Sequence, residues 1–302
     1  MNRRAWSLFL LVSVLWGIPY FLIKIAIDDL SPVFVVAGRA FIAALVLLPV
    51  AAARGTLAAV RARLGVVTMI AAVHIIGPFL LITYGEVHIT SSLTGLLIAF
   101  EPVVIALLMS RAEPLTPIRV AGLALGFAGV AVLVGLDLSG DRLGLVGAGM
   151  VLLAAIGYAV ATMLVQRRAA DLAPEALAGG TTAITAVVLA PFAILTWPTP
   201  SAVHASAWTA LAILGVFCTA VALLAFYRLI ALAGSTKAGL VTYLNPVVAV
   251  LLGVLLLNEP LRWATVAGFV LVAAGCWLST RPPAPAPVPE LADALTRPSA
   301  AG

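Results

Sequence analysis

Long apolar stretches separated by short polar segments run along the chain from its first residues to about residue 280. A bilayer core about 30 Å thick needs roughly 20 apolar residues per helix, and ten stretches meet this requirement. They cover residues 6–26, 32–53, 64–84, 91–110, 118–136, 143–165, 175–196, 207–230, 238–257 and 263–280. The pattern therefore predicts an all-α membrane protein with ten transmembrane helices, embedded in a lipid bilayer.

The two ends of the chain differ in character. The first apolar stretch lacks an A-x-A cleavage site and is long, so we expect an uncleaved first span rather than a signal peptide. Residues 282–302 are rich in Pro and Ala and carry no apolar face. Such a composition is typical of a disordered or polyproline-like segment, and we predict a disordered tail there.

Composition supports the membrane prediction and narrows the function. Hydrophobic residues make up 63% of the chain and charged residues 10%, whereas soluble domains are about half apolar and a quarter charged. The net charge of +5 does not indicate nucleic-acid binding, because the basic residues lie singly or in pairs at segment ends. Cys218 and Cys276 both fall in apolar stretches and suit packing, so we expect no disulfide, metal or cofactor.

Lys and Arg are distributed unevenly between the two sets of span ends. One set holds Arg3, Arg4, Arg54, Arg61, Arg63, Arg111, Arg119, Arg167, Arg168, Lys237, Arg281 and Arg297. The other set holds Lys24, Arg142 and Arg262. Because cytoplasmic loops carry the excess of positive charge, both termini are predicted to be cytoplasmic, as an even number of spans requires.

The second half of the chain repeats the first. The clearest match joins residues 94–133 to residues 238–278. Aligned pairs include Gly95 with Gly239, Pro102 with Pro246, Glu113 with Glu259, Pro114 with Pro260, Gly122 with Gly268 and Gly129 with Gly275. We predict a first repeat over 1–137 and a second over 138–281, each with five spans. An odd number of spans inverts the second copy, which is typical of alternating-access transporters; duplication that only built a scaffold is the alternative.

These features resemble the EamA-type transporters of the drug/metabolite transporter superfamily. The resemblance rests on Trp16-Gly17, Ser31-Pro32 followed by Arg39, Glu101-Pro102, the two Glu-Pro turns at 113–114 and 259–260, and the glycine-dotted last span of each repeat. It implies ten helices around a central cavity, a bacterial cytoplasmic membrane, and export of amino acids, metabolites or drugs. The second repeat departs from the first, with Thr181 near the place of Arg39 and Asn245 in place of Glu101.

Polar residues within spans normally face protein or water, and their helical spacing locates the predicted cavity. The candidate solute-binding residues are Trp16, Tyr20, Arg39, His74, Glu101, Tyr158, Thr242, Tyr243 and Asn245. Aromatic walls with few polar anchors suit a small amphipathic solute, and a cation beside a carboxylate suits a zwitterion. Packing aromatics remain the alternative for Trp16, Tyr20 and Tyr158.

Several charged candidates also have structural interpretations. Lys24 lies near a span end, where it would snorkel to the headgroups or pair with Asp28. His74 is either a proton carrier or a neutral histidine bonded to a carbonyl freed by Pro78. Arg39, about two turns into the second span, would bind a solute carboxylate, or pair with Asp28, Asp29 or the carbonyls of another span.

Glu101 and Pro102 interrupt the fourth span with a carboxyl group and a helix-breaking residue. Pro246 repeats the proline, so Pro102 and Pro246 are predicted hinges of two broken or bent helices. A carboxyl group in a low-dielectric segment can exchange a proton near neutral pH, which makes Glu101 the candidate proton-coupling residue. Alternatively, a protonated Glu101 bonds the carbonyls that the break frees.

The predicted function is that of a secondary transporter. No catalytic or nucleotide-binding motif appears, so we do not expect an enzyme. Export of small solutes by alternating access, coupled to protons through Glu101, is the main hypothesis. A scaffold, a sensor and an uncoupled facilitator are the alternatives. The G-x-x-x-G motif of Gly122 and Gly126 favours close helix packing and leaves a homodimer open.

Overall fold

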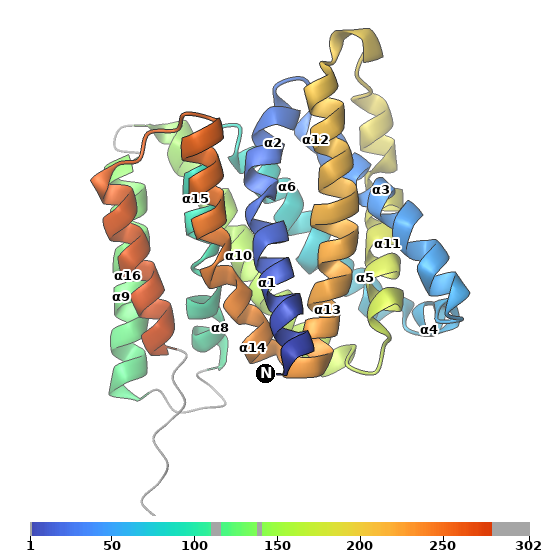
Figure 1. Cartoon of the computed structure of the whole chain (residues 1–302), viewed down its shortest axis with the longest axis horizontal. Helices are drawn as coiled ribbons and strands as arrows, with labels where there is room; N and C mark the ends of the chain where they lie inside the picture. The colour runs from blue at the N-terminus through green and yellow to red at the C-terminus, as the bar shows by residue number, and fades with distance from the viewer. Residues whose placement is uncertain (1, 110–115, 138–140, 280–302) are drawn as a thin grey trace, which may run out of the picture.

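The computed structural model describes residues 2–109, 116–137 and 141–279, and every regular element in these ranges is a helix. The first half contains α1 (Arg3–Gly17), α2 (Pro19–Ile27), α3 (Pro32–Ala53), α4 (Leu57–Ala62), α5 (Leu64–Ala71), the π-helix η1 (Ala72–Ile76), α6 (Gly77–Gly85), α7 (Ser91–Ile98), α8 (Glu101–Met109) and α9 (Pro117–Asp137). The second half contains α10 (Arg142–Arg168), α11 (Pro174–Leu195), the 3₁₀ turn η2 (Pro200–Ala202), α12 (Ala205–Gly215), the π-helix η3 (Val216–Val221), α13 (Ala222–Ala233), α14 (Ser235–Ala238), the 3₁₀ turn η4 (Gly239–Tyr243), α15 (Asn245–Leu256) and α16 (Trp263–Ser279). Figure 1 shows their arrangement as one bundle of upright helices.

The predicted spans are confirmed as membrane-length helical stretches. Within the described residues, nine stretches are long and apolar enough to cross a bilayer, and Trp263–Ser279 adds a tenth, shorter one of 17 residues. The chain is thus an all-helical, multi-pass membrane protein. The repeat boundaries at 137 and 138 stay predictions, and the predicted disordered tail lies outside the described residues.

The fourth span of each repeat is broken at the aligned prolines. In the first repeat α7 ends at Ile98 and α8 begins at Glu101, where Val103 N donates to Phe100 O at 3.0 Å. In the second repeat α15 follows η4, and Val247 N donates to Leu244 O at 3.1 Å. Each proline occupies the second residue of its new half-helix, where its missing N–H costs no helical hydrogen bond. The two breaks therefore have the same backbone design.

The broken helices run side by side in the centre of the molecule. A Cβ added at Gly95 of α7 would lie 2.5 Å from Ala249 Cβ of α15, so these half-helices are in close contact. Gly239 of η4 in turn faces Ile105 of α8. This antiparallel pairing brings Glu101 and Asn245, the residues beside the two breaks, to the middle of the bundle.

The last spans of the two repeats, α9 and α16, form a close helix pair at one edge of the bundle (Figure 1). A Cβ added at Gly275 would lie 2.6 Å from Gly126 Cα and 2.7 Å from the Gly122 carbonyl oxygen. At Gly129 it would lie 2.6 Å from Val272 N. The predicted close packing of these glycines thus occurs within one chain, so this face is not available to a second copy.

We expect Gly275→Val to prevent correct assembly of the protein. The new side chain would push backbone against backbone, and overpacking of this kind costs about 1–3 kcal/mol or more. Gly135→Ala on α9 is the matched control, because a Cβ there meets nothing within 4 Å. Size-exclusion chromatography of the detergent-solubilised variants measures the result. A monodisperse Gly275→Val protein with unchanged thermal stability would contradict the close crossing.

Candidate solute-binding cavity

A central cavity lies between the two repeats, where the helix breaks meet. Eight of the nine predicted solute-binding residues line it: Trp16, Tyr20, Arg39, His74, Glu101, Tyr158, Thr242 and Asn245. The cavity volume is about 50 Å³, whereas pockets that hold small-molecule ligands usually measure roughly 300–1,000 Å³. The structure therefore shows a contracted arrangement that must widen to admit a solute.

Tyr243 does not line this cavity. Its ring packs against the buried apolar cluster around α2, α7 and α10. The prediction that Tyr243 binds solute is therefore not supported by its position. The cause is local: η4 is a 3₁₀ turn, so the four-residue helical spacing assumed for this span does not hold there.

Arg39 is a buried guanidinium group that has no carboxylate partner among the described residues. Ser31 caps α3 by accepting a hydrogen bond from Phe34 N at 3.3 Å, which fixes the start of the helix that carries Arg39. Arg39 is 3% exposed, and its Nε donates to Thr219 Oγ1 at 3.0 Å. Its Cζ lies 4.0 Å from the centroid of the Phe79 ring.

The predicted ion pair of Arg39 with Asp28 or Asp29 is wrong. Asp28 is exposed, and Asp29 instead accepts hydrogen bonds from His204, through its backbone N–H at 2.9 Å and its imidazole Nδ1 at 2.9 Å. These bonds, the backbone bond first, lower the pKa of the Asp29 carboxyl group. Among the described residues, no carboxylate lies within ion-pair distance of Arg39.

Glu101 and Asn245 differ in what they bind, although they occupy matching positions. Glu101 stands in the first turn of α8, where the helix dipole favours a carboxylate, and Thr162 Oγ1 lies 3.5 Å from its Oε1. The Asn245 amide, oriented with its nitrogen toward two carbonyl groups, donates to Val241 O and Ser13 O at 2.9 Å each. Asn245 thus donates to two backbone carbonyl groups, whereas among the described residues Glu101 has a single weak partner, from α10.

An aromatic group surrounds His74 within η1. Its Nδ1 lies 2.8 Å from the Tyr227 hydroxyl of α13, so the prediction of a bond to a carbonyl freed by Pro78 is wrong. The Trp16 and Tyr158 rings stand edge-on to the imidazole, at centroid distances of 6.4 Å and 5.7 Å. Both rings also line the cavity, so Trp16 and Tyr158 pack against His74 and form part of the cavity wall at the same time.

Polar contacts between the two repeats join the loops at one end of the bundle. We call the end formed by the loops 28–31, 86–90, 196–204 and 257–262 the outer end, following the charge-based prediction. There Glu259 accepts hydrogen bonds from Ser91 N at 2.8 Å and Ser92 N at 2.9 Å. It also accepts bonds from both serine hydroxyl groups, so one carboxylate caps α7 from the opposite repeat. The aligned Glu113 lies outside the described residues.

The opposite end, called here the inner end, is also joined by contacts between the repeats. Arg54 pairs with Glu175 at 3.3 Å. Arg63 pairs with Asp171 at 3.0 Å and also donates to the carbonyl of Arg168 at 2.8 Å. The exposed Arg63–Asp171 pair contributes little energy, whereas Glu175 of the other pair is buried. Together with Glu259 at the outer end, these contacts join the two repeats at both ends of the bundle.

Sequence comparison places these features in a known family. The EamA-like transporter family profile matches residues 3–135 and again residues 145–281, one match for each repeat. This chain belongs to the EamA-like transporter family. It is therefore a membrane transporter, in a family of transporters rather than enzymes, built from two EamA domains.

Individual relatives agree with the family assignment. The chain is similar to the uncharacterized transporter YvbV of Bacillus subtilis, with 25% identity over 93% of this chain and 92% of the relative. It is also similar to the uncharacterized inner membrane transporter YedA of Escherichia coli K12, with 28% identity over 91% and 92%. A solved crystal structure matches with a TM-score of 0.65 and 21% identity, over 93% of this chain and 98% of that chain, and shows the same fold.

Thr162, the partner of Glu101, shares the polar stripe of the sixth span with Tyr158, but the roles of three other polar residues are not evident from the sequence. Thr219, the partner of Arg39, looks like an ordinary threonine in an apolar helix. Tyr227 gave no signal, because η3 shifts the phase of the eighth span before it reaches α13. Glu86 lies just beyond the predicted third span of residues 64–84, yet it is fully buried.

Lys24 also has a different partner from the one predicted. Its Nζ donates to the backbone carbonyl of Glu86 rather than pairing with Asp28 or reaching the headgroups. A cation at this carbonyl is favourable, because Glu86 ends α6 and the last carbonyls of a helix carry partial negative charge. Lys24 therefore connects α2 with the outer end of α6.

Proposed function

We propose that this EamA transporter is a secondary carrier that exports a small zwitterionic solute, such as an amino acid or a related metabolite. Its place would be the bacterial cytoplasmic membrane, with both termini in the cytoplasm. Transport would proceed by alternating access of a single central site. The residues at that site support the choice of a zwitterionic solute.

The single observation that carries the proposal is the buried Arg39 without a carboxylate partner. An uncompensated charge inside a membrane protein is costly, and such residues usually serve function. A solute carboxylate would supply the missing negative charge, in bidentate contact with the guanidinium group. Glu101 in the same cavity offers a counter-charge for an ammonium group. The aromatic walls formed by Trp16 and Tyr158 suit a small apolar side chain.

Alternating access follows from the two matching breaks. Pro102 and Pro246 each start a half-helix beside the cavity, so bending at either break would widen one end while the other stays closed. The contacts of Glu259 at the outer end and of Arg54 at the inner end would break in turn. Rocking of inverted repeats about a midplane site is the usual mechanism of carriers with this architecture.

Proton coupling is assigned to Glu101. Its one weak hydrogen bond leaves the carboxyl group available to a solute ammonium group or to a proton, but not to both. Because solute and proton compete for the Glu101 carboxyl group, solute export is coupled to proton entry without a further binding site. An uncoupled facilitator with the same cavity would carry solute only down its own gradient, and a pH gradient separates the two cases.

The test compares metabolites outside cells that produce this protein with those outside cells that produce Glu101→Gln. We expect one or a few zwitterionic solutes to accumulate outside the cells with the unaltered protein and to be depleted with the variant. Matching protein levels in the membrane fraction control for expression. Identical external profiles would contradict proton-driven export through Glu101.

A further inference from the structure

Glu86 is a buried carboxyl group that the proposed transport cycle does not yet use. It ends α6 at the outer end, where its N–H donates to Ile82 O at 2.8 Å. The residue is 0% exposed, and neither carboxyl oxygen has a hydrogen-bond partner in the described part of the chain. A charged carboxylate in such a place is strongly unfavourable, so the carboxyl group of this contracted arrangement carries its proton.

The groups that face Glu86 come from several elements. Lys24 and Tyr20 approach from α2, Arg39 from α3, and Glu259 from the connection between α15 and α16. Lys24 is the cation with the strongest electrostatic effect on the Glu86 carboxyl group. Its Nζ nevertheless donates to the backbone carbonyl of Glu86 and not to the carboxyl group. Lys24 could therefore pair with an ionised Glu86 carboxylate, but in this arrangement it binds the backbone carbonyl instead.

The charged side chains that act on Glu86 include none from α10. At the neighbouring Gly85, the nearest α10 atoms are the Gly147 carbonyl oxygen and a methyl carbon of Val151, which carry no charge. The neighbouring serines of α7, Ser91 and Ser92, direct their hydroxyl groups to Glu259. The outer contact thus uses the hydrogen-bond donors that would otherwise stabilise a second carboxylate here.

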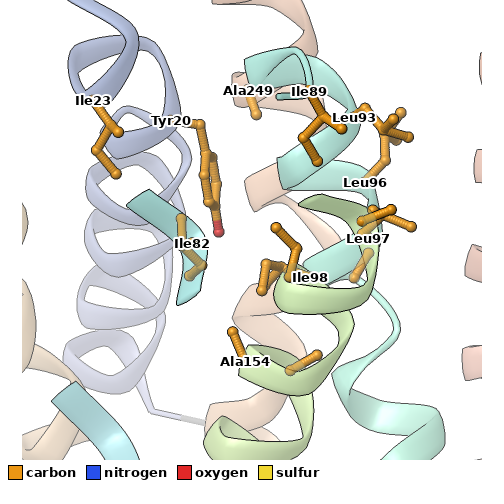
Figure 2. Packing of buried hydrophobic residues seen from close by; sticks show 14 of the residues in the cluster. Tyr20, Ile23, Ile82, Ile89, Leu93, Leu96, Leu97, Ile98, Ala154 and Ala249 are labelled. Atoms are coloured by element: carbon orange, nitrogen blue, oxygen red, sulfur yellow. The ribbon is translucent and has the colours of Figure 1, made fainter. Parts of the chain in front are cut away.

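Glu86 lies between the cavity and a polar pocket at the outer end. Tyr20 and Arg39, which would interact electrostatically with an ionised Glu86, line the cavity. Lys24 and Ser92 line the outer pocket, whose volume is about 330 Å³. Figure 2 shows apolar packing in the same region, with Ile23 and Tyr20 on one helix and the Tyr20 ring directed toward α7. Water excluded by this packing would reach Glu86 once the outer end opens.

We propose that Glu86 is a second proton-binding site, distinct from Glu101, and that release of its proton holds the outer end open. When α2 and α6 separate from α7, water enters and the carboxyl O–H bond breaks. The proton passes to water, and the resulting carboxylate pairs with the Lys24 ammonium group, which leaves the backbone carbonyl. Closing requires the reverse steps, because only the neutral carboxyl group can return to the dry site. This inference rests on the proposed alternating access but on no particular solute.

The test measures opening directly, without solute. Ile23→Cys places a thiol on α2 at a position that is 1% exposed in the contracted arrangement. Intact cells are labelled from outside with a membrane-impermeant methanethiosulfonate between pH 5.5 and 8. Thr199→Cys, at an exposed position of the outer end, corrects for the reactivity of the thiol itself. Protein without an introduced cysteine gives the background from buried Cys218 and Cys276.

The corrected labelling rate of Ile23→Cys should rise with pH, by up to about tenfold per pH unit, because each opening releases one proton. Adding Glu86→Gln should make the rate low and independent of pH, since a permanently neutral side chain favours the closed state. Glu86→Asp should retain the pH dependence. An unaltered pH dependence in Glu86→Gln, or its loss only in Glu101→Gln, would overturn the proposal. Size-exclusion profiles verify that each variant folds, and absence of export would not affect this result.

Discussion

Replacing Arg39 with methionine should abolish solute binding while leaving the empty protein as stable as before, or more stable. Methionine keeps the apolar stem beside Phe79 and removes the charge. Loss of a charge-assisted bond of about 1.5–3 kcal/mol weakens solute binding by roughly 10- to 150-fold. Removal of an uncompensated buried charge should not destabilise the empty protein. These two effects together distinguish a residue kept for function from one kept for the fold.

The measurement is the thermal unfolding midpoint of the purified protein, with and without each member of an amino-acid panel. A solute that raises the midpoint of the unaltered protein should not raise that of Arg39→Met. Thr219→Val is the matched control, because it removes the bond to Nε but keeps the charge, and should weaken binding less. Arg39→Lys should also bind poorly, since an ammonium group lacks the planar fork. Unchanged stabilisation of Arg39→Met by solute would rule out Arg39 as the carboxylate site.

Glu101→Gln should separate solute movement from proton movement. The amide can still accept a hydrogen bond from Thr162 and fill the same space, so solute exchange across the membrane should continue. The variant cannot bind and release a proton, so a pH gradient should no longer drive accumulation. With one proton per solute, a gradient of one pH unit supports a ratio of about tenfold in the unaltered protein. The variant should reach a ratio of one.

Two variants sharpen this assay in vesicles. Glu175→Gln changes another buried carboxyl group, which pairs with Arg54 at the inner end, and should keep the accumulation ratio. Glu86→Gln should lose both exchange and accumulation, because its outer end stays closed. If Glu101→Gln still accumulates solute about tenfold, proton coupling resides elsewhere.

Much of the fold follows from local patterns. The ten apolar stretches predict ten helices because bilayer thickness sets their length. The repeated prolines at 102 and 246 predict two breaks because proline is poorly tolerated inside a helix. Polar residues in apolar spans, such as Arg39 and His74, point to the cavity because lipid excludes them.

Contacts between distant segments could not be predicted in this way. Glu259 caps a helix 168 residues away along the chain, and no spacing rule connects it with Ser91. The π-helices η1 and η3 shift the helical phase by one residue, which hides the approach of Tyr227 to His74. Glu86 has the sequence context of a loop residue, and only its contacts with distant segments, Lys24 among them, make it buried.

The most direct test of the central claim is solute flux through the purified protein in vesicles. A zwitterionic solute that raises the unfolding midpoint is supplied outside vesicles whose interior is more acidic than the outside solution. Protons leaving the vesicles would then drive solute uptake by exchange. We expect uptake well above that of empty vesicles, accumulation set by the gradient, and no uptake with Arg39→Met. Equal uptake by empty vesicles and by vesicles with the protein, or equal uptake with Arg39→Met, would contradict transport through this cavity.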